Sequence, residues 1–186
     1  MKKKLVTRRD FINPIYKDRL RVLKTSEETG GVYTLAEIDI APGGSNTMHI
    51  HSAFEETFTA IKGTLGVRIK NKKHFLHPGG SMTVPLYTPH YFFNEGKESI
   101  TCQIQFFPAH ENFIKGLAIA YGLAADGMTS KKGIPKSILQ LALIMQLTDT
   151  KPAGLSGVLF PVFKWLARKA RKNGMEKVLL EKYYYQ

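Results

Sequence analysis

Residues 43–63 read GGSNTMHIHSAFEETFTAIKG, and residues 79–94 read GGSMTVPLYTPHYFFN. Three histidines and one glutamate stand in these two stretches: His49, His51, Glu56 and His90. Side chains two residues apart on a β-strand point to the same face, so His49 and His51 form a pair of imidazoles. Imidazole and carboxylate groups together suit divalent transition metals. The two stretches therefore predict a metal site.

The other two candidate ligands need a particular chain path to reach the histidine pair. Glu56 lies five residues after His51, which in an unbroken strand would place it on the opposite face. We therefore expect a turn at residues 52–54. His90 follows Pro85 and Pro89, residues that interrupt strand pairing, and we expect it on a later strand. The four side chains can then converge inside a closed sheet.

Both stretches resemble the motifs of the cupin superfamily, G-x5-H-x-H-x3,4-E-x6-G and G-x5-P-x-G-x2-H-x3-N. The matching residues are Gly43, His49, His51, Glu56, Gly63, Gly79, Pro85, His90 and Asn94. The resemblance implies a mainly β fold, a cupin-type antiparallel β-barrel or jelly roll. It also implies one divalent metal ion held by the three histidines and the glutamate. The sequence leaves the metal open among Fe, Mn, Zn and Ni.

Tyr87 is the departure from these motifs, because the family usually has glycine there. A tyrosine does not easily adopt positive φ, so we expect the loop before His90 to be reshaped. Tyr87 is also our candidate catalytic residue, as a hydrogen-bond donor to a bound substrate, with space filling as the alternative. We expect Phe58, Tyr91 and Phe93 to form the pocket walls, with Tyr87 at the mouth.

Short β-rich segments separated by turn residues support a barrel independently of the motifs. The expected strands are residues 32–40, 58–61, 65–69, 75–76, 82–84, 91–93 and 100–107. We expect 58–61 and 65–69 to form a hairpin around Gly63. Residues 30–108 are predicted to be the cupin barrel, with residues 1–29 a basic segment that packs on it.

Residues 109–186 are predicted to be a C-terminal helical extension, which the resemblance does not cover. Helices are expected at residues 113–125, 135–147, about 155–172 and 175–184, with Gly174 between the last two. Their apolar side chains must be buried. We favour a cap or dimerisation element and a homodimer. The alternative is that the basic amphipathic helix at residues 160–172 lies on an anionic membrane surface.

The net charge is +12 and the sequence pI is about 9.8. Most of the excess positive charge lies in residues 1–24 and 164–182. Basic ends can attract nucleic acid, anionic lipid or acidic partners, although solvated basic faces without a partner fit equally well. We expect no nucleic-acid partner, and a small molecule as substrate or ligand.

Two further observations concern the cellular compartment. Arg8 and Arg9 resemble a twin-arginine export signal, but charged residues replace the apolar run that must follow. No segment has the roughly 18 uninterrupted apolar residues of a membrane span. We therefore expect a cytoplasmic protein. A single cysteine, Cys102, excludes an internal disulfide, and we expect it to be a buried apolar residue.

A cupin-type metal site is compatible with several functions, because one fold supports many reactions. We favour a metal-dependent enzyme of dioxygenase or isomerase type that acts on a small organic molecule. The alternatives are a non-catalytic, metal-stabilised ligand-binding or sensor module, and a peripheral membrane-associated protein that uses its basic helical tail. The remaining histidines, His74, His77 and His110, are expected to be structural or solvated.

Overall fold

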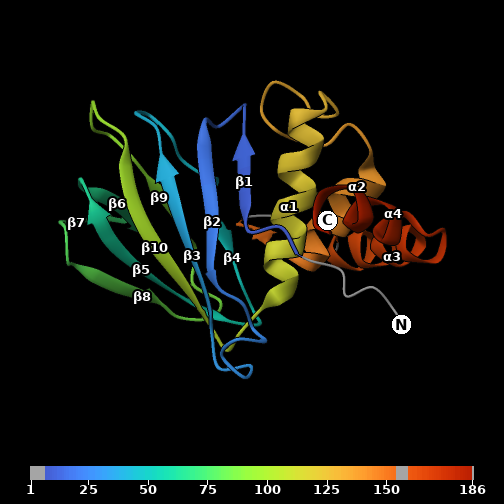
Figure 1. The fold of residues 1–186 in the computed structure, drawn as a ribbon, viewed down its shortest axis with the longest axis horizontal. Coiled ribbons are helices and arrows are strands. Elements are labelled where there is room, and N and C mark those ends of the chain that lie inside the picture. The colour runs from blue at the N-terminus through green and yellow to red at the C-terminus, as the bar shows by residue number, and fades with distance from the viewer. Residues whose placement is uncertain (1–6, 154–158, 186) are drawn as a thin grey trace.

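The computed structural model describes residues 7–153 and 159–185. Antiparallel β-strands form one half of the molecule and helices the other (Figure 1). The strands are β1 (Asp10–Asn13), β2 (Asp18–Lys24), β3 (Thr34–Ile40), β4 (His49–Ile50), β5 (Glu55–Lys62), β6 (Leu65–Ile69), β7 (Lys72–Leu76), β8 (Ser81–Val84), β9 (His90–Phe93), β10 (Ile100–Phe107) and β11 (Lys151–Pro152). The helices are α1 (Glu111–Ala125), α2 (Ile138–Leu147), α3 (Leu159–Lys172) and α4 (Met175–Tyr183).

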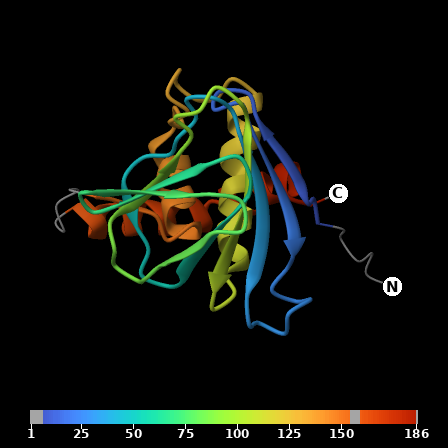
Figure 2. The ribbon, with the colours of Figure 1, turned by 90° about the vertical axis from the view of Figure 1, so that its left-hand side faces the viewer.

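The strands lie in two sheets that enclose a shared interior. One sheet has the order β1-β2-β3-β10-β5-β8, and the other has the order β11-β4-β9-β6-β7. Figure 2, viewed from the side of β7 and β8, shows the strands in front of the helices. The predicted fold class, a mainly β jelly roll of antiparallel strands with C-terminal helices, is confirmed.

Burial alternates residue by residue along β3 and β10, as expected for strands with one face in a core. Ile38 and Ile104 point inward, whereas Glu37 and Gln103 on the same two strands lie on the outer face. Cys102 is one of the inward positions and is fully buried, as predicted. The apolar period of two therefore decides which face of this sheet encloses the interior.

The predicted hairpin at Gly63 is wrong. β5 pairs with β10 and β8, while β6 pairs with β7 and β9 in the other sheet, so the chain crosses between sheets at this glycine. Gly63 has a φ of +76°, and an added Cβ would lie 2.6 Å from Ile100 Cγ2. The sequence could not distinguish the two paths, because a tight hairpin and a crossing between sheets both place a glycine between two short strands.

The N-terminal segment does more than pack on the sheets, because residues 10–24 add β1 and β2 to the six-stranded sheet. β2 pairs with β3 and buries Leu20 and Val22 on its inner face. On the outer face, Arg21 pairs with Glu37 and Asp39 of β3, at 2.8 Å in each case. The division at residues 29/30 and 108/109 stays a prediction.

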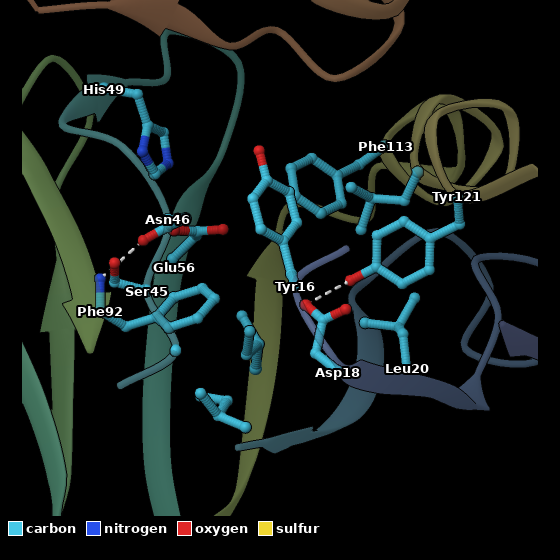
Figure 3. A pocket seen from close by; sticks show the side chains of 14 residues that line it. Tyr16, Asp18, Leu20, Ser45, Asn46, His49, Glu56, Phe92, Phe113 and Tyr121 are labelled. Atoms are coloured by element: carbon cyan, nitrogen blue, oxygen red, sulfur yellow. Dashed lines mark hydrogen bonds between the residues drawn. The ribbon is translucent and has the colours of Figure 1, made fainter. Parts of the chain in front are cut away.

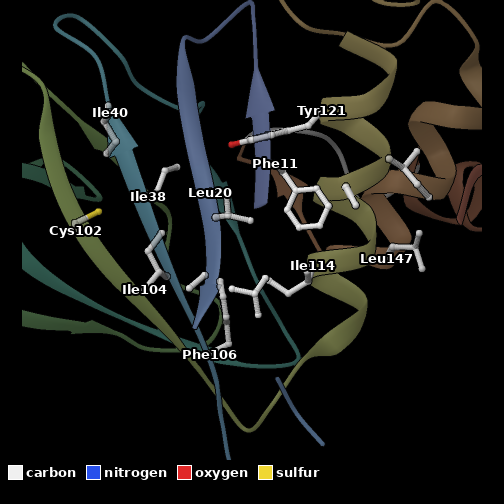
Figure 4. Packing of buried hydrophobic residues seen from close by; sticks show 14 of the residues in the cluster. Phe11, Leu20, Ile38, Ile40, Cys102, Ile104, Phe106, Ile114, Tyr121 and Leu147 are labelled. Atoms are coloured by element: carbon white, nitrogen blue, oxygen red, sulfur yellow. The ribbon is translucent and has the colours of Figure 1, made fainter. Parts of the chain in front are cut away.

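Helix α1 joins the sheets to the rest of the helical extension. Ile114 and Tyr121 of α1 lie in one hydrophobic cluster with Leu20 of β2 and Phe106 of β10 (Figure 4). Helices α2, α3 and α4 lie on the far side of α1 (Figure 1). Gly174, with a φ of +79°, separates α3 from α4 as predicted.

Two expectations about the extension concern the start of its third helix and its ability to span a membrane. The third helix was expected to begin near residue 155, but residues 154–158 lie outside the described part of the chain. Within the described part, α3 begins at Leu159. Among the described helices, none combines the length and the apolarity that a bilayer span requires.

Candidate metal centre

The four predicted ligands meet in one buried cluster. His49, His51, Glu56 and His90 each offer one donor atom, and these atoms lie within 4.8 Å of one another. All four side chains are at least 95% buried. The structure therefore brings together the complete set that the sequence predicts, close enough to bind a metal ion.

Both sheets contribute to the cluster. In the five-stranded sheet, the pairing of β4 with β9 places His49 directly opposite His90. Bends at residues 52 and 53 then carry the chain to β5 in the six-stranded sheet, where Glu56 faces the histidines. The turn expected between His51 and Glu56 is confirmed. Because the chain turns, Glu56 lies on the opposite sheet and faces the histidines, whereas in an unbroken strand it would point away from them.

Backbone carbonyl groups orient all three imidazole rings. A carbonyl oxygen only accepts hydrogen bonds, so the Nδ1 atom that faces it carries the proton and donates. This leaves Nε2 of each ring as the atom available to a metal. The bonded pairs are His49 Nδ1 with Thr47 O at 2.7 Å, His90 Nδ1 with Thr88 O at 2.8 Å, and His51 Nδ1 with Asp149 O at 3.1 Å.

Burial and the glutamate together set the protonation of the cluster. Burial lowers the pKa of His49 to about 4 and also lowers the pKa of His51. His90 Nε2 lies 2.7 Å from Glu56 Oε2. Burial opposes the charged forms of this pair, but their hydrogen bond outweighs it, raising the pKa of His90 and holding that of Glu56 low. At neutral pH two neutral imidazoles therefore face an ionised carboxylate.

Nε2 of His51 faces the cluster without a hydrogen bond. The atom is buried, and within residues 7–153 and 159–185 it has no hydrogen-bond partner. It lies 3.7 Å from Glu56 Oε1. A buried imidazole lone pair without a donor is costly, and coordination of a cation would satisfy it. The residues present thus fit a divalent metal ion, and their three imidazoles and one carboxylate suit Fe, Mn, Ni, Co, Cu or Zn.

Tyr87 adopts the backbone conformation that we expected it to avoid. Its φ is +59°, so the side chain accepts the left-handed region that glycine would occupy without strain. Its backbone N–H donates a 2.8 Å hydrogen bond to the carbonyl of His51. The side chain of Tyr87 is 66% exposed and does not line the cavity described below. The loop before His90 therefore keeps its turn at a local conformational cost.

A cavity of about 130 Å³ opens beside the cluster and is lined by His49 and Glu56 (Figure 3). Most of its wall is apolar. The apolar side chains are Leu20, Ile40, Phe92, Ile104, Phe113 and Leu117. The cavity combines a few polar groups with apolar walls, as small-molecule sites do, but it is smaller than the roughly 300–1,000 Å³ of drug-sized pockets. It therefore fits only a small ligand.

The predicted aromatic walls are wrong, and the period of the strand explains why. His90 points inward, so Phe92 two residues later also points inward and lines the cavity. Tyr91 and Phe93 lie on the other face, where Phe93 packs against Phe75 with ring centroids 5.8 Å apart. Phe58 is buried 6.1 Å from the ring of His90 but does not line the cavity.

The other histidines lie away from the cluster. His77 is exposed and His74 is half-buried on β7. His110 is half-buried against Phe54, with ring centroids 4.8 Å apart, and its Nε2 lies 3.3 Å from the carbonyl oxygen of Leu147. Burial lowers the pKa of His110, so the ring is neutral and structural.

Two parts of the site were missed by the sequence analysis. Asp149 follows α2 and accepts hydrogen bonds at the turn that joins two ligands. Asp18 and Tyr121, from β2 and α1, line the cavity on the side away from the cluster (Figure 3). No spacing rule connects these residues to the motifs, because their positions depend on how the terminal segments pack on the sheets.

Residues 36–104 match the family described as Cupin domain. A comparison with curated proteins finds no match. The matched region contains all four residues of the cluster, whereas Asp18, Tyr121 and Asp149 lie outside it.

Several solved structures are similar to part of this chain at low identity. The polyketide cyclase RemF from Streptomyces resistomycificus is 18% identical with a TM-score of 0.46, covering 57% of this chain and 79% of that one. The Cupin_2 domain of an XRE family transcriptional regulator from Enterobacter cloacae is 21% identical with a TM-score of 0.43, covering 48% and 95%. A sugar phosphate isomerase of the cupin superfamily from Silicibacter pomeroyi is 17% identical with a TM-score of 0.45, covering 56% and 71%. Similarity at this level does not transfer an activity to this chain.

Proposed function

We propose that this chain, a member of the cupin superfamily with additional C-terminal helices, is a metal-dependent enzyme. Its substrate would be a small organic molecule. The observation that carries this proposal is the cluster of four buried donor atoms within 4.8 Å. His49, His51, Glu56 and His90 would hold one divalent ion. Bound there, the ion would supply Lewis-acid or redox chemistry to a substrate in the adjoining cavity.

The chain itself would supply binding and shielding. Phe92, Phe113 and Leu117 offer an apolar surface to a hydrocarbon group and keep bulk water out. The carbonyl groups of Thr47, Thr88 and Asp149 hold the imidazoles in the tautomer that presents Nε2. These features support catalysis on a molecule that fits a cavity of about 130 Å³. The reaction that we propose is of dioxygenase or isomerase type.

Metal content is the decisive experiment. We expect near-stoichiometric metal by inductively coupled plasma mass spectrometry in protein purified without an affinity tag. The substitution His51→Ala should lower the occupancy sharply, while His74→Ala on β7, outside the cluster, should not. Equal occupancy in the two variants would remove His51 from the ligand set. Absence of metal even after reconstitution would contradict the enzyme proposal.

The identity of the metal then directs the activity assay. Iron calls for oxygen-consumption assays over a panel of small organic molecules, because iron supports O2 chemistry. Zinc, nickel or manganese calls for isomerase and lyase assays. Tyr87 stays a predicted hydrogen-bond donor to substrate, and Tyr87→Phe should lower kcat several-fold if that prediction is right. An unchanged kcat would leave Tyr87 with a conformational role only.

A second candidate is a ligand-binding or sensor module, which the contact between the extension and the cluster favours. Asp149 follows α2 and its backbone carbonyl holds His51, so occupancy of the site and the position of the helices are linked. In this function the protein binds metal and ligand without turnover. Ligand binding that alters protease sensitivity of residues 159–185, with no product formed, would distinguish it from the enzyme.

Helix α3 supports the proposal of a homodimer or, as the weaker alternative, of contact with an anionic membrane. Val162 and Trp165 are exposed on it, among basic side chains such as Lys169. A dimer would cover these apolar groups, and anionic lipid would attract the charged ones. Light scattering tests the first idea, and sedimentation with anionic vesicles at low and high salt tests the second. A cytoplasmic location and the lack of a nucleic-acid partner remain predictions.

A further inference from the structure

The cavity has a second polar end that the cupin domain does not supply. Asp18 of β2 and Tyr121 of α1 line the same cavity as His49 and Glu56, from outside residues 36–104. Figure 3 shows Asp18 and Tyr121 together on one side of the cavity and His49 on the other. The segments before and after the cupin domain thus complete this cavity with groups of their own.

Asp18 has one carboxylate oxygen in use and one without a protein partner. The hydroxyl of Tyr121 donates a 2.9 Å hydrogen bond to Oδ2. Oδ1 is buried, and no group in the described part of the chain donates to it. A buried carboxylate oxygen with no donor is costly, so such an atom marks a place where a ligand donor would be favourable.

The protonation of the pair suits this role. Burial raises the pKa of Asp18 to about 6, so the carboxyl group is mostly ionised at pH 7.5 and can accept hydrogen bonds. Burial also raises the pKa of Tyr121 well above its usual value. The phenol therefore keeps its proton and holds Asp18 in place as a positioning residue.

The space between the two polar ends restricts the ligand in size and polarity. Leu20, Ile104 and Phe113 are among the apolar side chains that line it. The volume of about 130 Å³ is close to the roughly 150 Å³ of a cavity that holds benzene. A ligand that fits has a short hydrocarbon body of a few carbon atoms.

We propose that the cavity binds a short organic acid that carries a hydroxyl or amino group, with the carboxylate of Asp18 accepting the hydrogen bond of that group. The placement of the ligand's carboxylate at the metal ion rests on the proposed function. A divalent ion with three neutral imidazoles and one glutamate retains a positive charge, which attracts an anionic oxygen. Asp18 is then a specificity-determining residue, and acids without a donor group bind less well.

Two probes of matched size test this assignment. Pentanoate and 4-hydroxybutanoate differ by a methyl group in place of the hydroxyl, and their Kd values can be measured by isothermal titration calorimetry on the metal-loaded full chain. We expect 4-hydroxybutanoate to bind about tenfold more tightly, because its hydroxyl can donate a hydrogen bond to the charged carboxylate and the methyl group cannot. Equal affinities, or no binding of either probe at millimolar concentration, would overturn the proposal.

Variants separate Asp18 from the rest of the cavity. Asp18→Leu should bring the ratio of the two Kd values to about one, and Asp18→Asn, which keeps the shape and one acceptor, should reduce it to about twofold or threefold. Asp10→Leu is the control, because Asp10 lies on the neighbouring strand and pairs with Arg19 at the surface. An unchanged ratio in Asp18→Leu would contradict the assignment.

The same samples show whether the proposed function fails independently. Metal content in Asp18→Leu should equal that of the wild type, since Asp18 is not part of the metal cluster. Wild-type metal content with no discrimination between the probes refutes the role of Asp18 and leaves the metal site standing. Loss of metal binding in the wild type refutes the metal function, and discrimination by the metal-free protein would still support Asp18.

Discussion

His51 Nδ1 donates a 3.1 Å hydrogen bond to the backbone oxygen of Asp149, a residue outside the matched cupin domain. The carboxylate of Asp149 also accepts hydrogen bonds from the hydroxyl of Ser52 at 2.9 Å and from the backbone N–H of Ala53 at 2.7 Å. One residue at the end of α2 thus holds a ligand ring and the turn that leads to Glu56. The helical extension therefore supports the geometry of the candidate metal centre.

This relationship predicts that Asp149→Ala weakens metal binding. Loss of the carboxylate frees the turn at residues 52–53, and groups that orient metal ligands typically contribute 10- to 100-fold to affinity. We expect the apparent Kd for Zn²⁺, measured by competition with a chelator, to rise at least about tenfold. Full stoichiometry should still be reached at saturating metal, because all four ligands remain.

Asp126→Ala is the matched control for this prediction. Asp126 also accepts side-chain hydrogen bonds, from Lys182 and Tyr183 at 2.6 Å each, but it lies at the end of α1 and outside the metal cluster. Its substitution should leave the Kd unchanged. If Asp149→Ala bound Zn²⁺ as tightly as Asp126→Ala, the carboxylate would have no part in positioning His51.

Tyr87 predicts an unusual order of stability among its own substitutions. Its φ of +59° costs a non-glycine residue roughly 1–2 kcal/mol, and its exposed side chain contributes little packing. Tyr87→Gly should therefore have a free energy of unfolding about 1 kcal/mol higher than Tyr87→Ala in urea denaturation. At Leu86, which lacks positive φ, the order should be reversed, with alanine above glycine. The same order at both positions would show that Tyr87 is not strained.

The sequence predicts His49, His51 and Glu56 well because their information is local, whereas His90, far along the chain, is placed by its match to the second motif. The spacing of His49 and His51 and the turn before Glu56 follow from the period of a strand, which holds wherever the strand lies. The same rule, applied from His90, would have placed Phe92 in the cavity instead of Tyr91 and Phe93. That error came from choosing aromatic residues by type instead of by register.

The rest of the site depends on packing between distant segments. Whether Gly63 starts a hairpin or a crossing depends on which partner each strand finds, and both paths use the same residues. Asp18 and Asp149 reach the site only because β2 pairs with β3 and the end of α2 docks beside the turn. Neither the charge of these two aspartates nor the period of a strand marks them as site residues, because an aspartate exposed to solvent can stand in the same local sequence.

Close packing between α1 and α4 gives a third prediction. An added Cβ at Gly122 would collide with the ring of Tyr183. Gly122→Ala should lower the free energy of unfolding by about 1–3 kcal/mol, although alanine gains about 1 kcal/mol of helix propensity. In the background of Tyr183→Ala, where the ring is absent, the same substitution should stabilise the protein. Destabilisation of equal size in both backgrounds would exclude this contact as the cause.

The partly buried carboxyl group of Asp18 predicts a pH-dependent gain in stability on substitution. Its folded pKa of about 6 exceeds the ordinary 3.8, so between these values the folded state binds a proton that the unfolded state has released. The protonated carboxyl group therefore contributes stability to the wild type below about pH 4, and this contribution is lost as pH rises through about 6. The shift corresponds to about 3 kcal/mol, and Asp18→Asn should recover about 1–2 kcal/mol at pH 8, because its amide is also partly unsatisfied. Urea denaturation at pH 4 and pH 8 measures the difference.

Asp10→Asn is the control with the opposite sign. The hydrogen bond from Arg19 lowers the pKa of Asp10, so this substitution should destabilise the protein slightly at pH 8 only. A gain in Asp18→Asn that is equal at both pH values would show that Asp18 titrates normally.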